Sequence, residues 1–414
     1  MLNSRFERMR NNPLTLPFYL PSLLLAFSDG MLALILPLYV ADFEISYGTI
    51  GLVLAASGAG QLIGDLPAGR VISRMNARTM MIQGLVVIIL STLVLFLLPS
   101  IAAILVSRFI TGLGMAWFNV SRQAYATEKM ILVKRGRAMS IFGGVNRIGK
   151  IPAAQLSGMI AGTFNIRAPF LLYCIVASIA LYFIWRYAED STSIAAASTP
   201  DQPRTSYREA LRANRQTIFA AGIGQVFIQM IRKGREDIIP LYASDVLGLD
   251  VETIGTIGSI SSAIETTLFY PSGIVMDRFG RKYSIVPQFL VFAVGMMLIP
   301  LTTNFTTLLI VASAIGAANG LTSGTMKTMG ADLATHLNHH EFLGLWQLIG
   351  DGGITLSPIV AGAVAQATVL GNASFIMASF GVAAALIFAF YVPETLRKPD
   401  TESAAIVSKA PSKV

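Results

Sequence analysis

Residues 35–42 read Ile-Leu-Pro-Leu-Tyr-Val-Ala-Asp, and residues 238–245 read Ile-Ile-Pro-Leu-Tyr-Ala-Ser-Asp. The two stretches agree at five of eight positions and lie 203 residues apart. Two shorter repeats keep nearly the same offset, Thr49-Ile50-Gly51 with Thr253-Ile254-Gly255 and Pro67-Ala68-Gly69 with Pro271-Ser272-Gly273. Because this offset is about half of the 414-residue chain, the sequence indicates two related halves.

The composition points to lipid rather than water as the main solvent of the chain. Hydrophobic residues make up 54% of the sequence and charged residues 13%. Soluble domains carry about 25% charged residues, so this supply cannot cover a globule of this size. We therefore exclude a soluble enzyme and a disordered chain. The single cysteine, Cys174, also excludes a disulfide scaffold.

Twelve apolar runs divide the sequence, six in each half. They lie at about 14–41, 47–72, 79–98, 101–127, 138–163, 168–187, 216–243, 253–276, 284–301, 307–331, 342–367 and 372–393. A membrane helix needs about 20 apolar residues, so each run can span a bilayer. We expect an all-α polytopic membrane protein with two pseudo-symmetric six-helix bundles. The expected parts are a first bundle (1–188), a polar linker (189–215), a second bundle (216–395) and a tail (396–414).

Basic residues are distributed by side of the predicted membrane. Twenty-two of the 31 Lys and Arg fall in the termini, the linker and alternate loops, whereas the opposite loops hold only Arg167 beside several acids. Cytoplasmic loops of membrane proteins are enriched in Lys and Arg. We therefore expect a cell-membrane protein with both termini and the linker in the cytoplasm. The net charge of +8 is then a topology signal and does not indicate nucleic acid.

The loop after the eighth run reads Gly273-Ile-Val-Met-Asp-Arg-Phe-Gly-Arg-Lys282. Its first-half copy, which begins at Gly69, has Ser73 in place of the acid and Asn76 in place of the second glycine. Charges in such a loop can pair with neighbouring helix ends and lock one conformation, although they could also be plain orientation anchors. The candidate gating residues are Gly69, Arg74, Gly273, Asp277, Arg278, Gly280 and Arg281.

This loop resembles the signature loop of the major facilitator superfamily. The stretch Arg108-Phe-Ile-Thr-Gly-Leu-Gly114 is similar to another pattern of that family. Asp29-Gly30 and Arg232-x-x-Arg235 resemble its twelve-span drug/proton antiporter branch, although Pro152 in the fifth run lacks the adjacent glycine typical of that branch. The resemblance implies the major facilitator fold, a small-molecule substrate and proton coupling. It implies no cofactor or metal. Because each chain holds both halves, we expect a monomer.

Many ionisable residues lie inside the predicted spans. A charge at the centre of a membrane helix costs about 2.5–3.5 kcal/mol on insertion scales, so these residues must face a cavity or one another. The basic ones are Arg108, Arg122, Arg147, Lys150, Arg232, Lys233, Arg235 and Lys327, and the acidic ones are Asp29, Asp65, Glu236, Asp237, Glu265 and Asp351. Their number favours a polar translocation path.

Depth along the helices predicts one proton-coupling pair in each half. Counted at 1.5 Å per residue from the outer helix ends, Asp29 lies near the level of Arg108, and Glu265 near that of Arg232. An acid beside an arginine stays ionised until a ligand diverts the arginine, and it can then take up a proton. A static pair that fixes helix register is the alternative.

The fifth run contains Arg147 and Lys150 one turn apart, together with Asn146. With Arg122, this group could receive an anionic substrate or the carboxylate of a zwitterion. Asp351 lies at a similar depth in the eleventh run and could either neutralise the group or contact the substrate. These five residues are the candidate substrate-binding set.

Proton-coupled efflux of an amphipathic or cationic compound is the leading functional hypothesis, because it follows from the closest resemblance. Proton-coupled transport of an anionic or zwitterionic metabolite or lysolipid is the alternative that the basic residues of the fifth run favour. A non-transporting receptor or scaffold is a third possibility. A membrane-embedded enzyme would need an acid–base constellation at the membrane surface, and the sequence shows none.

The topology gives a first testable prediction. Protease added to inverted membrane vesicles should cleave the chain within residues 189–215, because this stretch is polar, contains proline and is expected to face the cytoplasm. The same protease added to right-side-out vesicles should leave the stretch intact, as immunoblots of the two halves would show. Cleavage from outside would contradict the assigned orientation.

Overall fold

The computed structural model describes residues 14–71, 75–129, 135–190, 215–322, 324–334 and 339–396. The described segments form twelve helical spans, which confirms the predicted fold class. The first half consists of the π-helical turn η1 (Thr15–Tyr19), α2 (Leu20–Ala41), α3 (Tyr47–Val71), α4 (Ala77–Leu97), α5 (Ile101–Lys129), α6 (Arg135–Thr163) and α7 (Ala168–Tyr187). The second half consists of α9 (Arg215–Asp245), α10 (Val251–Thr267), α11 (Phe269–Phe279), α12 (Arg281–Leu298), the 3-10 turn η4 (Ile299–Leu301), α13 (Phe305–Leu321), α14 (Thr325–Leu333), α15 (His339–Ala367) and α16 (Leu370–Phe390).

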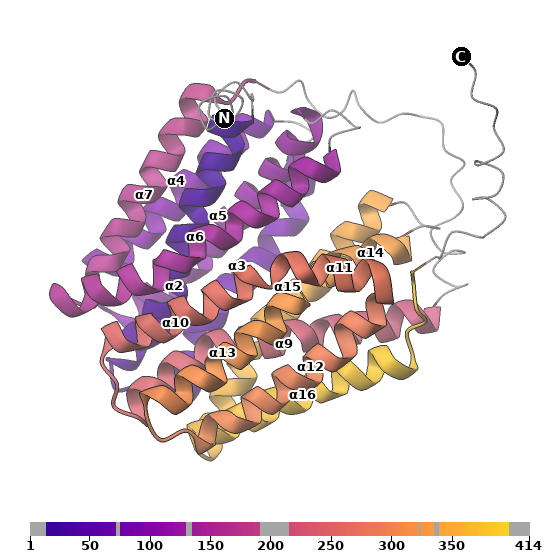
Figure 1. Cartoon of the computed structure of the whole chain (residues 1–414). Coiled ribbons are helices and arrows are strands. Elements are labelled where there is room, and N and C mark those ends of the chain that lie inside the picture. The colour runs from indigo at the N-terminus through magenta and orange to yellow at the C-terminus, as the bar shows by residue number, and fades with distance from the viewer. Residues whose placement is uncertain are drawn as a thin grey trace, which may run out of the picture.

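The two halves lie side by side as separate bundles (Figure 1). The first span begins at Thr15 and the last ends at Phe390 on the same side, which we call the terminal side; the opposite side is the far side. The first bundle ends at Tyr187 and the second begins at Arg215, so most of the expected linker (189–215) and tail (396–414) lies outside the described residues.

Two spans of the second half are interrupted, each for a local chemical reason. The eighth breaks at Leu268 between α10 and α11, because Pro271 has no N–H to donate to the carbonyl of Thr267. The tenth breaks between α13 and α14, where Gly324 has a φ of +83° that favours glycine. Pro67, the first-half counterpart of Pro271, lies inside a continuous α3.

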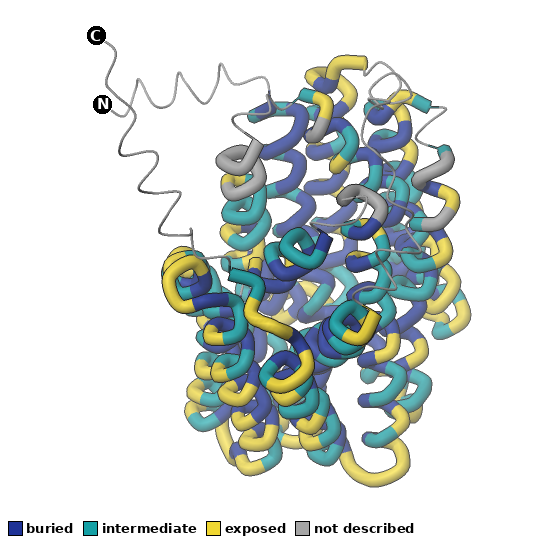
Figure 2. The backbone as a smooth tube through the Cα atoms, turned by 90° about the vertical axis from the view of Figure 1, so that its right-hand side faces the viewer, coloured by how far each residue is buried: buried dark blue, intermediate teal, exposed yellow. Residues whose placement is uncertain are grey.

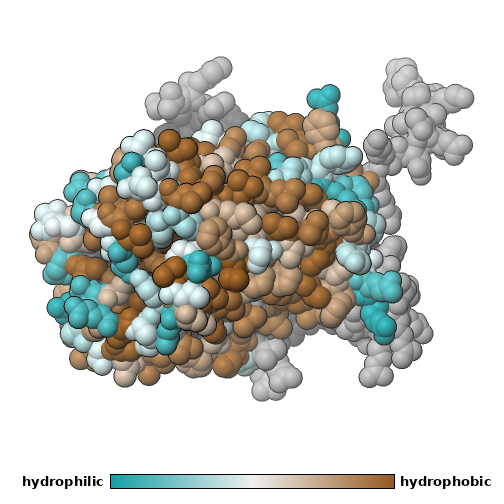
Figure 3. Space-filling model, turned by 90° about the horizontal axis from the view of Figure 1, so that it is seen from below, coloured by the Kyte–Doolittle hydropathy of each residue, from teal (hydrophilic) through white to brown (hydrophobic). Residues whose placement is uncertain are grey.

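The outer surface of both bundles is apolar, as a lipid environment requires. Exposed residues lie on the outward faces of the helices (Figure 2), and apolar side chains cover a broad part of the surface seen from below (Figure 3). Nine helical segments in the described part of the chain are long and apolar enough to cross a bilayer. The spans outside this set are α6, α9 and the α10–α11 pair, which carry most of the charged residues that lie inside the spans.

The halves meet along two seams, α6 against α10 and α3 against α15. At the first seam the backbones approach closely: a Cβ on Gly158 would lie 2.6 Å from the carbonyl oxygen of Val251. A Cβ on Gly255 would lie 2.6 Å from that of Ala154. Glycine is thus required for this packing. Near the second seam, the Tyr47 hydroxyl donates to Asp245 over 3.1 Å, joining the far-side ends of α3 and α9.

The internal repeat is visible in hydrogen bonds on the terminal side. In the first half, Arg78 donates to Asp190 (3.0 Å) and to the carbonyl of Trp185 (2.6 Å). In the second half, the Lys282 backbone N–H donates to Glu394 (2.9 Å), and its ammonium donates to the carbonyl of Ala389 (2.9 Å). Each second-half residue lies 204 positions after its first-half counterpart. The two halves therefore brace their last helices in the same way.

In the signature loop, the strongest side-chain ion pair is made by Arg281 and not by Asp277. Arg281 binds Asp332 at 3.0 Å, whereas Asp277 is largely exposed and 3.5 Å from Arg281. Gly280 has a φ of +110°, as a tight turn requires, but Gly273 is helical with nothing within 4 Å of a Cβ there. No close backbone approach among the described residues therefore requires glycine at position 273.

The remaining candidate gating residues add little to this network. Arg278 lies over the ring of its neighbour Phe279, 5.6 Å from the centroid. Gly69 lies within α3, and Arg74 lies outside the described residues. The gating role of all seven residues stays a prediction.

The close packing of α6 against α10 predicts the effect of a larger residue at the seam. Gly158→Leu should lower the thermal unfolding midpoint of the purified protein, because overpacking of this kind costs about 1–3 kcal/mol. Gly162→Leu is the matched control on the same helix, since nothing lies within 4 Å of a Cβ at that position. Equal midpoints for the two variants would show that the seam does not depend on Gly158.

Glu394 predicts a pH dependence of stability. Burial alone would raise the pKa of Glu394, but backbone N–H groups of Leu396, Lys282 and Arg281 donate to the carboxylate and bring the pKa below its ordinary value. A carboxylate whose pKa is lower in the folded state than in the unfolded state stabilises the folded protein at pH values above its unfolded-state pKa of about 4.3. This contribution to stability is lost as the pH falls through the folded-state pKa.

Glu394→Gln should therefore unfold at a lower temperature than the wild type at pH 7. The difference in midpoint should begin to close as the pH falls below the unfolded-state pKa of about 4.3, and it should vanish once the pH lies below the folded-state pKa, where both side chains are neutral. Thermal unfolding of both proteins in nonionic detergent, measured at pH 7 and at acid pH, tests this prediction. A difference that persists unchanged at acid pH would contradict the role of the ionised carboxylate.

Candidate functional site

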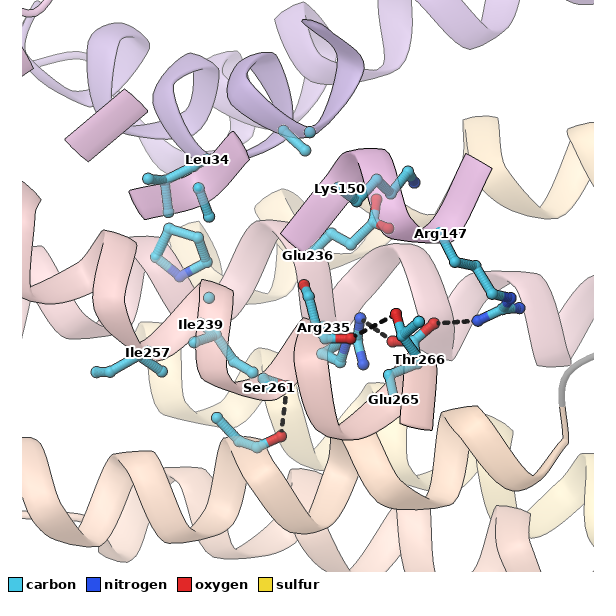
Figure 4. A pocket seen from close by; sticks show the side chains of 17 residues that line it. Leu34, Arg147, Lys150, Arg235, Glu236, Ile239, Ile257, Ser261, Glu265 and Thr266 are labelled. Carbon is cyan, nitrogen blue, oxygen red and sulfur yellow. Dashed lines mark hydrogen bonds and ion pairs between the residues drawn. The ribbon is translucent and has the colours of Figure 1, made fainter. Parts of the chain in front are cut away.

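A cavity lies between the two halves at the α6–α10 seam (Figure 4). Its volume is about 130 Å³, and residues of α2, α6, α9, α10 and α13 line it. We call it the central cavity. Its lining comprises Gly30, Ala33, Leu34, Arg147, Lys150, Ala154, Arg235, Glu236, Ile239, Pro240, Ile257, Gly258, Ser261, Ser262, Glu265, Thr266 and Ala312.

Glu265 is the centre of the charge network in this cavity. One carboxylate oxygen accepts from Arg147 of the first half over 2.9 Å, and the other accepts from Arg235 of the second half over 3.0 Å. Asn319 also hydrogen-bonds the carboxylate. The Arg147 guanidinium lies 4.9 Å from the ring centroid of Phe269. One buried carboxylate thus joins the two bundles near the middle of their helices.

A second electrostatic contact crosses the cavity beside the first. Glu236 of α9 interacts with Lys150 of α6, and the two side chains lie close together in Figure 4. Lys150 is exposed although it lies in the middle of α6, so water reaches it from the cavity. The neighbouring Lys233–Asp237 pair, at 2.7 Å within α9, neutralises itself.

The cavity has an apolar part and a charged part. Leu34, Ile239 and Ile257 lie toward the far-side ends of their helices. The charged residues lie on the terminal-side half, away from these apolar residues (Figure 4). The lining contains three cations, Arg147, Lys150 and Arg235, against the two carboxylates of Glu236 and Glu265. The cavity as a whole is therefore amphiphilic, and its charged terminal-side half has an excess of positive charge.

The predicted pair of the first half is not in direct contact. Asp29 accepts from the Tyr173 hydroxyl over 3.3 Å, and Arg108 donates to Ser57 over 2.7 Å. The buried Nε and Nη1 atoms of Arg108 have no partner among the described residues. The field of Arg108 reaches Asp29, but that of Lys150 reaches it more strongly. The coupling role of Asp29 and Arg108 stays a prediction.

The predicted pairing of Glu265 with Arg232 is wrong. Arg232 instead donates to the hydroxyl and the carbonyl of Thr322 (3.0 and 3.3 Å) and lies over the Phe289 ring. Arg232 and Arg235 are one turn apart on α9, so depth alone cannot distinguish them. Arg235 faces α10 and takes the place that the sequence assigned to Arg232.

The candidate substrate-binding set is only partly brought together. Arg147 and Lys150 line the cavity. Arg122 instead donates to Asn119 over 2.9 Å and lies over two aromatic rings. The Asn146 amide donates to the carbonyl of Phe142, within its own helix. Neither residue lines the cavity, although the field of Arg122 also reaches Asp29.

Asp351 lies at the other seam and does not neutralise Arg147 as the sequence suggested. It accepts from Gln61 of α3 over 3.4 Å and from Gln347 over 3.0 Å. The internal repeat explains this position. Asp351 follows Arg147 by 204 residues, and Glu265 follows Gln61 by the same number. The contacts Arg147–Glu265 and Asp351–Gln61 are therefore equivalents on the two seams.

Several site residues carry no sequence signal specific enough to identify them. Ser261, Ser262 and Asn319 are ordinary polar residues within spans, and only the packing of α10 and α13 brings them to the site. For Arg235, the sequence signal was its spacing of three residues from Arg232, because residues three apart are neighbours on one side of a helix.

The site can bind a small polar group, exchange ion-pair partners and respond to protonation. A carboxylate between two guanidinium groups is held by charge-assisted hydrogen bonds. A ligand that takes one guanidinium weakens the link between the halves and makes the carboxylate easier to protonate. Such a site is suited to binding and conformational change.

Comparisons with known proteins agree with this arrangement. A family model described as the Major Facilitator Superfamily matches residues 19–238 and 238–413. The chain is 25% identical over 292 residues to "Multidrug resistance protein 2" of Bacillus subtilis (strain 168). This match covers 69% of this chain and 72% of that protein. It is 24% identical over 264 residues to "Multidrug resistance protein MdtL" of Escherichia coli O45:K1 (strain S88 / ExPEC), which covers 64% of this chain and 66% of that protein.

A solved structure shows the same fold over nearly the whole chain. The crystal structure of a D-xylose-proton symporter matches with a TM-score of 0.71 at 17% sequence identity, covering 92% of this chain and 98% of that one. The family match spans both halves, and the two bundles enclose a charged cavity. The chain therefore belongs to the Major Facilitator Superfamily and is a multi-pass membrane transporter, not an enzyme.

Proposed function

We propose that the chain is a proton-coupled secondary transporter that exports a small amphipathic compound by alternating access. The observation that carries this proposal is the Glu265 carboxylate, which is held at once by Arg147 of one half and Arg235 of the other. The multidrug resistance proteins to which the chain is similar support export. We place the transporter in the cell membrane as a monomer, with the terminal side in the cytoplasm.

The contacts between the halves support an entrance on the terminal side. The hydrogen bond from Tyr47 to Asp245 and the Gly158–Val251 contact lie at far-side helix ends. The Arg147–Glu265 pair lies near the middle. The terminal-side networks of Arg78 and Arg281 remain within their own halves. A compound entering from the cytoplasm would thus reach the cavity while the far-side ends are closed.

The coupling step follows from exchange of partners at Glu265. A substrate that engages Arg147 removes one of the two cations that keep the carboxylate ionised, so substrate binding and the protonation state of Glu265 are linked. Once neutral, Glu265 no longer holds the two bundles together at this point. Asp29 is a second candidate carrier, because Lys150, Arg122 and Arg108 lie within its electrostatic range.

A transport assay in proteoliposomes tests this proposal. Glu265→Gln should abolish accumulation driven by a pH gradient, because the amide cannot carry the proton, while exchange of substrate without a gradient stays measurable. Lipophilic dyes and drugs serve as the substrate panel. Asp29→Asn, assayed in parallel, determines which carboxylate couples transport to protons.

Glu252→Gln is the matched control. This acid lies on the same helix as Glu265, at the exposed far-side end and outside the cavity, and its replacement should leave accumulation unchanged. Wild-type accumulation by Glu265→Gln would rule out Glu265 as the coupling group. Wild-type accumulation by both Glu265→Gln and Asp29→Asn would contradict the proposed coupling mechanism.

A further inference from the structure

We propose that the central cavity recognises an anionic headgroup, a carboxylate or a phosphate, on an amphipathic compound, and that Glu265 occupies the place of this headgroup when the cavity is empty. This inference rests on the proposed function in naming the substrate class of the same site. It differs from the cationic substrates that the sequence resemblance favours.

The first observation is the excess of positive charge at the charged end of the cavity. Three cations, Arg147, Lys150 and Arg235, line it beside two carboxylates. Lys327, an exposed residue of α14, adds its field to those of Arg147 and Arg122 from the terminal side. A cationic substrate would enter against this field, whereas an anionic one would be attracted by it.

The second observation is donor capacity that Glu265 does not use. The Nη1 atom of Arg235 is buried and has no hydrogen-bond partner among the described residues. The Lys150 ammonium has no hydrogen bond or ion pair within 4 Å in the described part of the chain, and water reaches it. A guanidinium offers five N–H donors, so Arg147 and Arg235 can each hold a carboxylate in place of Glu265.

The third observation is that the lining of the cavity changes from apolar to charged along the direction from the far side to the terminal side. The apolar residues Leu34, Ile239 and Ile257 lie toward the far side, and the charged residues lie toward the terminal side (Figure 4). An amphipathic molecule would therefore place its apolar body toward the far side and its headgroup among the cations. The cavity, with a volume of about 130 Å³, holds several water molecules and therefore has room for a small polar headgroup.

Displacement of Glu265 gives this recognition a mechanical consequence. Arg147 belongs to the first half, whereas Glu265 and Arg235 belong to the second. When a ligand anion takes over Arg147, the ion pair between the halves is broken. Binding of the correct headgroup is thereby linked to release of the seam, which a compound without an anion cannot achieve.

A binding experiment with charge-matched probes tests the inference without requiring transport. The probes are 2-naphthoate, 2-naphthyl phosphate and trimethyl(2-naphthyl)ammonium, which share one ring system and differ in headgroup charge. Calorimetric titration into the full chain in nonionic detergent gives each dissociation constant, with protein-free micelles as the blank. Both anions should bind at least about tenfold more tightly than the ammonium compound, as expected for one charge-assisted hydrogen bond.

Variants locate the binding site. Arg147→Gln and Lys150→Gln should each weaken 2-naphthoate about tenfold or more, for the same reason. Glu265→Gln should strengthen it, because the competing carboxylate is gone. Arg186→Gln, at the exposed terminal-side end of α7, removes the same charge outside the cavity and should bind like the wild type. Lys150 has no ion-pair partner within 4 Å in the described residues, so its variant serves as the test if Arg147→Gln does not fold.

Three results would overturn the inference. They are equal or tighter binding of the ammonium probe, wild-type affinity for 2-naphthoate in both cation variants, or weaker binding by Glu265→Gln. Absence of pH-driven transport by the wild-type protein, with this binding pattern intact, would instead contradict the proposed function and leave the substrate class standing.

Discussion

The structure depends on the neutralisation of a buried carboxylate by arginines from both halves of the chain. Glu265 is largely buried and hydrogen-bonded by Arg147 and Arg235. Removing one partner of a buried ion pair typically costs about 3–5 kcal/mol, because the remaining charge stays uncompensated. The α6–α10 seam is therefore held by an interaction that is strong while intact and that a competing ion can exchange. A transporter needs both properties at the interface between its bundles.

The internal repeat explains why only one seam carries this ion pair. Arg147 and Asp351 are equivalent positions, as are Gln61 and Glu265. The α6–α10 seam joins an arginine to a glutamate, whereas the α3–α15 seam joins an aspartate to a glutamine at 3.4 Å. Breaking the second contact separates no pair of opposite charges. The two seams therefore differ in strength and in their response to ligands, although equivalent positions of the internal repeat form both of them.

The sequence predicts the fold well because the signals for it are local or periodic. Apolar runs, the repeat at a constant offset and the loop at residues 273–282 are read along the chain. The structure and the family match confirm the twelve spans in two bundles that these signals predict. The partners of charged residues were predicted less well, because depth along a helix is available from the sequence and the facing direction is not. Glu265 was thus assigned to Arg232 instead of Arg235.

Longer-range partners were missed for a related reason. Arg281 binds Asp332, and its backbone N–H donates to Glu394, 51 and 113 residues away in the sequence. Neither acid belongs to a recognisable motif. These groups meet only through the packing of the second bundle, which places the ends of α12, α14 and α16 next to one another.

The central claim is that the Glu265 ion pair, near the middle of the spans, keeps the far-side ends of the two halves close together. Spin labels at Thr163 and Glu252, exposed positions near the far-side ends of α6 and α10, report this separation by double electron–electron resonance in a Cys174→Ser background. The account predicts that Glu265→Gln shifts the distance distribution toward a longer, separated population. An unchanged distribution in the folded Glu265→Gln variant would contradict it.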